Sequence, residues 1–248
     1  YKNKDILIPD LIKKELDNSY EIQIDVVDTQ NYSVPQVRER AIILMTRKDV
    51  RKKWHFPRKE KNIATIKDVI GHLPTLDPFI KDVSKEELLK FFPKFEERKK
   101  KALQISKWHY PPHHVKRQVV AMMHTPTGKS AFDNIKYKPI KESGKPVKGF
   151  LNTYKRQHWN RPAYTITMDN VKISSQNNVH PGKLIGRNSI GDKIYSDART
   201  LTLYELMKLM TLPDNWALPE KTSIAFVRRI IGEGIPPLFV KKIFSTLM

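Results

Sequence analysis

Three polar side chains at alternate positions, Gln36, Arg38 and Arg40, have the types and spacing to bind an anion or the edge of a base. An apolar run, Ala-Ile-Ile-Leu, follows them directly. Alternate side chains of a β-strand point to one face, so we expect all three on the same side. Two guanidiniums and an amide converging there suit a phosphate or a base edge. The alternative is a solvated polar edge beside a buried strand.

The charge balance indicates a polyanionic partner. Lys and Arg number 46 against 26 Asp and Glu, which gives a net charge of +20. A nucleic acid fits this excess best. Only the family resemblance given below favours double-stranded DNA, with RNA as the weaker alternative. A membrane partner is not expected, because neither a basic amphipathic helix nor a bilayer-spanning run stands out.

The chain contains no cysteine. This excludes disulfides, cysteine zinc sites and thiol catalysis by the chain itself. It also fits a reducing compartment, and together with the charge it predicts a cytoplasmic, nucleoid-associated protein. The first residue is Tyr, so we expect that a natural start precedes it.

Hydrophobic periodicity predicts an α/β piece at the start of the chain. Apolar residues at helical spacing predict a helix over 6–16, and alternation predicts strands over 20–27 and 40–46. One helix and two strands suit the end of a larger sheet and cannot close it alone. The remaining strands are therefore expected to come from elsewhere.

The rest of the chain is less periodic. Short helices are predicted over 65–70 and 84–92, and irregular structure with a few short helices and strands over 93–160. A strand over 161–168 and a loop-rich stretch over 169–198 should follow. Three helices are then predicted over 200–212, 224–231 and 237–247, the first with a capping box of Thr202 and Glu205.

Two further strings contain residues that local structure does not explain. In residues 199–216 a capped amphipathic helix accounts for Thr202 and Glu205, but not for Arg199 before it or Leu-Pro-Asp-Asn-Trp after it. In residues 231–237 the string Ile-Gly-Glu-Gly-Ile-Pro-Pro separates two helices. An ordinary helix–loop–helix turn is the alternative there. Glycines at such a place also let the backbone approach a ligand closely.

The three strings, in this order, resemble motifs of DNA cytosine-C5 methyltransferases: Gln-x-Arg-x-Arg, then Arg-x-Leu-Thr-x-x-Glu with a Pro-Asp-x-Trp exit, then Gly-Asn-x-x-x-Pro. The resemblance covers residues 20–46 and 160–248 well. It implies an enzyme that flips a cytosine out of DNA and methylates its C5. That reaction uses a cysteine nucleophile, so the resemblance implies the C-terminal half, or a β-type subunit, of such an enzyme.

The resemblance assigns a role to the residues of the first two motifs. Arg40 is expected to bond the flipped base, while Arg38 and Gln36 support the active site. Arg199 and Glu205 are expected to hold the recognition domain in shape.

The third motif implies a cofactor contact. Gly232, Glu233 and Gly234 are expected to cover part of S-adenosylmethionine, the rest of its pocket lying in the missing N-terminal half. Glu233 stands where the family commonly has Asn, so an acidic side chain would face the methionine ammonium instead.

The resemblance also implies a partner. A second polypeptide, or the missing N-terminal half, should carry the Pro-Cys and Glu-Asn-Val motifs, as in a heterodimeric enzyme of a restriction–modification system. On its own the chain is expected to be inactive. The alternative is a non-catalytic, sequence-specific DNA-binding module descended from such an enzyme.

The implied fold is α/β: the tail end of a Rossmann-like methyltransferase sheet plus an irregular α+β target recognition domain. Residues 1–47 would close the catalytic domain, 48–160 would form the recognition domain, and 161–248 would end it and return to the catalytic domain. Each expected DNA contact has solvated surface as its alternative. These contacts are Thr167, Lys129, Ser130, Arg117, Lys155 and Arg156.

Two other patterns are rejected. His109, His113 and His114 lie close in sequence without nearby carboxylates or cysteines, so no metal is expected. Residues 125–130, Thr-Pro-Thr-Gly-Lys-Ser, end like a nucleotide-binding loop, but Met123 stands where that loop needs glycine.

Overall fold

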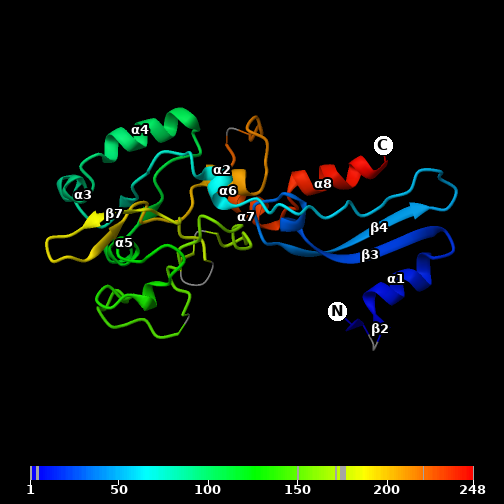
Figure 1. Cartoon of the computed structure of the whole chain (residues 1–248), viewed down its shortest axis with the longest axis horizontal. Helices are drawn as coiled ribbons and strands as arrows, with labels where there is room; N and C mark the ends of the chain where they lie inside the picture. The colour runs from blue at the N-terminus through cyan, green and yellow to red at the C-terminus, as the bar shows by residue number, and fades with distance from the viewer. Residues whose placement is uncertain are drawn as a thin grey trace.

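The computed structural model describes residues 2–3, 6–149, 151–170, 172–173, 177–219 and 221–247. The molecule is elongated, with a two-stranded sheet at one end and a lobe of short helices at the other (Figure 1). We call this lobe, residues 77–158 and 177–198, the distal lobe. Helices and the extended segment 161–168 form a junction between the two ends.

The sheet is an antiparallel pair of strands, β3 (Tyr20–Asp28) and β4 (Glu39–Arg47), connected through a 3-10 turn. The predicted strands are confirmed: β3 extends one residue further at its C-terminal end, and β4 one residue further at each end. The apolar run of β4 alternates between the two faces of the sheet, as expected for period-two geometry. Around this pair lie η1 (Thr29–Tyr32), β1 (Lys2–Asn3), β2 (Ile6–Leu7) and α1 (Ile8–Leu16).

One face of the sheet is covered by the C-terminal helix α8 (Pro237–Phe244). Val27 of β3 and Leu44 of β4 pack with Phe239 and are almost fully buried. The last turn, η3 (Ser245–Leu247), extends this helix. The two ends of the described chain thus share one small core.

The opposite face of the sheet is apolar and open to solvent. Its cross-strand pairs are Ile22 with Met45, Ile24 with Ile43 and Val26 with Ala41. Val26 is 66% exposed, Met45 40% and Ile43 37%. An apolar strand face of this kind is normally buried against another layer of structure.

The distal lobe surrounds its own core. Parallel strands β5 (Phe79–Ile80) and β6 (His113–His114) pair, and β7 (Leu184–Arg187) forms a hairpin with β8 (Lys193–Tyr195). Apolar residues from the helices fill the centre, among them Phe95, Val119 and Met122. The helical elements are α3 (Lys85–Phe91), α4 (Phe95–Ile105), α5 (Lys116–Met123) and η2 (Ala131–Asp133).

The junction is built on α2 (Ile66–Ile70), α6 (Leu203–Leu209) and α7 (Ile224–Glu233). Helices α2 and α6 pack on each other and, with Ile166 and Ile231, form the central core. The capping box predicted for α6 is present, because the Thr202 hydroxyl accepts the N–H of Glu205 and the Glu205 carboxylate accepts the N–H of Thr202.

One prediction of secondary structure is wrong. Residues 161–168 do not form a ladder strand, since within the described part of this segment only Ala163 bridges, to Gln36. Side-chain hydrogen bonds take the place of ladder bonds: the Gln36 Oε1 accepts the N–H of Ile166, and the Thr165 hydroxyl donates to the carbonyl of Val37. Residues 93–160 contain short helices, as expected, among them α4 and α5.

A buried ion-pair network joins the distal lobe to α6. Both terminal nitrogens of Arg199 donate to the carboxylate of Glu205, at 2.8 and 2.9 Å, and one also donates to Asp197 at 2.9 Å. The Arg199 Nε donates to the carbonyl of Leu76. Burial alone would raise the pKa of Glu205, but attraction to Arg199 outweighs burial and holds it well below its ordinary value. The expected structural role of Arg199 and Glu205 agrees with this geometry.

We predict that Arg199→Met lowers the free energy of unfolding by about 3–5 kcal/mol, because two buried carboxylates lose their counter-charge. Urea unfolding measures the change. Arg47→Met is the matched control: its pair with Asp49 is exposed to solvent, so the free energy of unfolding should stay nearly unchanged. Equal losses in the two variants would contradict the assignment.

Two histidines are buried beside this network as neutral rings. The Nε2 of His114 accepts the N–H of Thr200 at 3.1 Å, and the Nδ1 of His180 accepts the N–H of Gly182 at 3.1 Å. Burial, reinforced by the positive charge of Arg199, lowers the pKa of His114 to about 3. Burial likewise lowers the pKa of His180 to about 4.

We predict that stability falls as the pH drops from 7.5 to 5. Both folded pKa values lie below the ordinary value of about 6.5, so the unfolded chain binds more protons in this window. The loss should be on the order of 2 kcal/mol for each histidine. His114→Gln, whose amide oxygen can replace Nε2 as an acceptor, should show a clearly shallower pH dependence by urea unfolding. An unchanged slope in that variant would contradict the prediction.

Candidate nucleic-acid interface

Gln36 lies in the junction, fully buried. Its side-chain oxygen accepts the N–H of Ile166 at 3.0 Å, and its side-chain nitrogen lies 2.9 Å from the sulfur of Met210. Both ends of the amide therefore contact protein. Gln36 fixes the segment that returns from the distal lobe and is not available to a ligand.

Arg38, two residues on, is also fully buried and spans two segments that are distant in sequence. One terminal nitrogen donates to the carbonyl of Ile166 at 2.8 Å and the other to that of Gly232 at 2.7 Å. Burial, and secondarily the charge of Arg40, lowers the pKa of Arg38 to about 10, which keeps it protonated at neutral pH. The expectation that all three polar side chains converge on one ligand is therefore wrong for Gln36 and Arg38, whose side chains are buried and hydrogen-bonded to protein.

Arg40 is the second residue of β4 and pairs with Val27. Its side chain is half-buried, and one terminal nitrogen donates to the carbonyl of the neighbouring Glu39 at 2.6 Å. It takes part in no ion pair within the residues described here. Of the three motif side chains, Arg40 is thus the one placed to meet an external anion or base.

The third motif packs against the returning segment. A Cβ on Gly232 would lie 2.3 Å from the backbone of Thr167, so only glycine fits where α7 crosses this segment. Gly232 is buried and faces protein, which does not fit the expected ligand contact. Glu233 is exposed, where it pairs with Arg229, and the N–H of Gly234 donates to Ile230. Only Glu233 and the half-buried Gly234 remain accessible for a cofactor.

The expected DNA contacts divide into two groups. Lys129 is exposed, Lys155 lies over the ring of Tyr164, and Arg117 and Thr167 are half-buried. These four remain reachable from outside.

Ser130 and Arg156 were expected to contact DNA, but both side chains are hydrogen-bonded inside the protein. The Ser130 hydroxyl accepts the N–H of Phe132 and donates to the carbonyl of Thr153. Arg156 is fully buried, and its guanidinium donates to the four backbone carbonyls of Met122, His180, Ser196 and Asp197. A guanidinium with its donors used inside the protein cannot also bind DNA.

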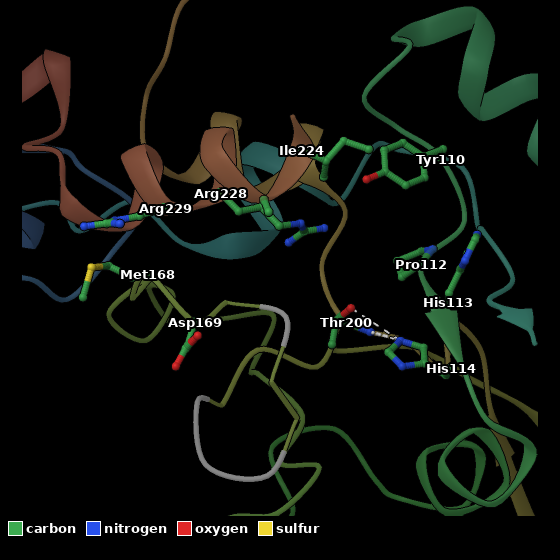
Figure 2. A pocket seen from close by; sticks show the side chains of 11 residues that line it. Tyr110, Pro112, His113, His114, Met168, Asp169, Thr200, Ile224, Arg228 and Arg229 are labelled. Atoms are coloured by element: carbon green, nitrogen blue, oxygen red, sulfur yellow. Dashed lines mark hydrogen bonds between the residues drawn. The ribbon is translucent and has the colours of Figure 1, made fainter. Parts of the chain in front are cut away.

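Sequence reasoning missed Arg228 on α7. Its side chain is 95% buried by contact with neighbouring segments and lines a cavity of about 700 Å³ (Figure 2). One terminal nitrogen donates to the side-chain oxygen of Asn170 at 2.9 Å. The two adjacent arginines in an otherwise apolar helix were the available signal, but sequence alone does not say which one points inward.

Within the described residues, no helix has the length and apolar character needed to cross a membrane.

Comparison with known proteins gives consistent results. The chain is 41% identical over 241 residues to the Type II methyltransferase M1.HgaI of Avibacterium volantium, covering 97% of this chain and 59% of the relative. It is 23% identical over 229 residues to M1.HphI of Haemophilus parahaemolyticus, covering 92% of this chain and 48% of the relative. The chain thus spans about half the length of these relatives.

The fold agrees as well. A prophage-encoded candidate DNA modification methyltransferase from E. coli aligns with a TM-score of 0.58 at 16% identity, over 97% of this chain and 63% of that one. The family described as C-5 cytosine-specific DNA methylase matches residues 2–248. The chain therefore belongs to the C-5 cytosine-specific DNA methylase family.

Proposed function

We propose that this chain is the DNA-recognising and scaffold-closing part of a DNA cytosine-C5 methyltransferase of a restriction–modification system. The observation that carries the proposal is the contrast within one motif: Gln36 and Arg38 are buried as supports, while Arg40 is left at the edge of the sheet. Arg40 would contact the flipped cytosine, and the distal lobe would act as the target recognition domain.

The nucleophile would come from a second part of the enzyme, on the same or another polypeptide. Two observations support this. The chain has no cysteine. The face of the sheet that carries Val26, Ile43 and Met45 is apolar and exposed, which suits burial by the rest of a larger sheet domain.

S-adenosylmethionine would supply the methyl group. Within this chain the accessible Glu233 carboxylate fits the methionine ammonium, and Gly234 lies beside it. Gly232 would act indirectly, by allowing α7 to pack on the backbone of Thr167. Most of the cofactor pocket would lie in the cysteine-bearing part.

The accessible basic side chains would hold the DNA backbone. Lys129, Lys155 and Arg117 belong to the distal lobe, and Thr167 lies where the chain returns from it. The net charge of +20 favours such contacts at long range, so binding should weaken steeply with salt.

The proposal is tested by transfer of a labelled methyl group from S-adenosylmethionine to duplex DNA. The chain alone should bind DNA and transfer nothing. With a polypeptide carrying the Pro-Cys and Glu-Asn-Val motifs it should transfer, and Arg40→Ala should reduce the rate by about 100-fold or more. Arg47→Ala, at the exposed far end of the same strand, is the control and should keep the rate.

Methyl transfer by the chain alone would contradict the two-part proposal. Failure of any such partner to restore transfer, with duplex binding intact, would instead favour a non-catalytic DNA-binding module.

A further inference from the structure

A cavity of about 700 Å³ lies between α7 and the distal lobe, and none of its lining residues carries the functions proposed above. Its size falls within the range of about 300–1,000 Å³ typical of ligand sites. Helix α7 forms one side, the segment after Tyr110 the other, and Met168 and Asp169 the lower edge in Figure 2.

Arg228 points from α7 toward the middle of this cavity (Figure 2). It makes no ion pair among the described residues, and its hydrogen-bond partners are neutral: the Asn170 side chain and the hydroxyl of Tyr110. The Glu205 carboxylate attracts it from beyond ion-pair distance, but that carboxylate is hydrogen-bonded to Arg199. A buried guanidinium whose direct partners are neutral keeps its capacity to bind an anion.

The charged side chains at the rim of the cavity, Asp169 and Arg229, already form ion pairs with other residues. Asp169 pairs with Lys172 at 2.6 Å, and Arg229 pairs with Glu233 at 3.0 Å. The floor also holds the buried Thr200 next to the neutral ring of His114. An incoming anion would therefore meet the unpaired charge of Arg228 without a free carboxylate to repel it.

The walls are largely apolar and partly aromatic. Tyr110 and Pro112 face Ile224 across the cavity, and Met168 is 53% exposed at its edge. An anion bound here would therefore need a flat or apolar group, attached to its charged group, to contact these walls. A nucleotide combines both, since its sugar and base pack on apolar and aromatic side chains while its phosphate meets a guanidinium.

We propose that this cavity binds one nucleotide of the DNA substrate, with the phosphate on Arg228 and the sugar and base against Tyr110 and Ile224. The proposal rests on the DNA-recognising function proposed above. The cavity edge at Met168 directly follows Thr167, an accessible expected phosphate contact, so both would be reached by one DNA strand.

The test compares two adjacent substitutions on α7. Ala225 is exposed and lines the cavity, whereas Phe226 is exposed and does not. Ala225→Glu and Phe226→Glu add the same charge near the same helix end. Duplex binding is measured by fluorescence anisotropy across a salt series for the wild type and both variants.

Ala225→Glu should weaken binding at least about tenfold and reduce the slope of log affinity against log salt by about 0.9, the loss of one phosphate contact. Phe226→Glu should stay within about threefold of the wild type. Arg228→Gln, checked for folding by circular dichroism, should reproduce the Ala225→Glu effect.

Equal behaviour of the two glutamate variants would overturn the proposal. So would an Ala225→Glu variant that loses binding of thymidine 5′-phosphate but keeps duplex affinity, because the cavity would then take free nucleotides. Absence of DNA binding by the wild type would overturn the proposed function itself.

Discussion

The Arg38 guanidinium holds the three parts of this molecule together. It lies at the start of the sheet and donates to a carbonyl of the returning segment and to one at the end of α7. Burying an isolated guanidinium costs several kcal/mol, and charge-assisted hydrogen bonds of about 1.5–3 kcal/mol each offset that cost only if their geometry is fixed. Arg38 therefore helps to fix the relative placement of sheet, junction and C-terminal helices, together with the hydrogen bonds of Gln36 and Thr165 across the same junction.

Buried arginines recur as supports in this chain. Arg156 is held by backbone carbonyls alone, whereas Arg199 is held mainly by carboxylates. The distal lobe has little regular sheet or long helix, so its loops depend on such side chains to satisfy buried carbonyl groups. Arg40 and Arg228, by contrast, take part in no ion pair within the described residues.

Sequence patterns predicted the features that local physics decides. The strands around Arg40 follow from alternation, and the cap at Thr202 follows from the spacing of its hydroxyl and the acidic Glu205. The bounds of helix α4 could not be predicted, because it buries only Phe95 and Ala102 beneath a lysine-rich surface and its apolar period is weak.

The burial of Arg156 could not be predicted for a different reason. Its carbonyl partners come from residues 122, 180, 196 and 197, which only the tertiary fold brings together. Lys155 and Arg156 look alike in sequence as basic neighbours, yet one is accessible and the other is not. In the same way, alternation placed Gln36, Arg38 and Arg40 on one side, but it did not show that the first two are fully buried and that Arg40 is only half-buried.

The most direct test of this account is the unfolding free energy of two variants, Arg38→Met and Arg40→Met, measured in urea. Arg38→Met leaves two buried carbonyls without their donor and should lose about 3 kcal/mol. Arg40→Met should change stability by less than about 0.5 kcal/mol, because Arg40 bonds only a neighbouring carbonyl at the sheet edge. Equal losses would contradict the division between a supporting Arg38 and a ligand-facing Arg40.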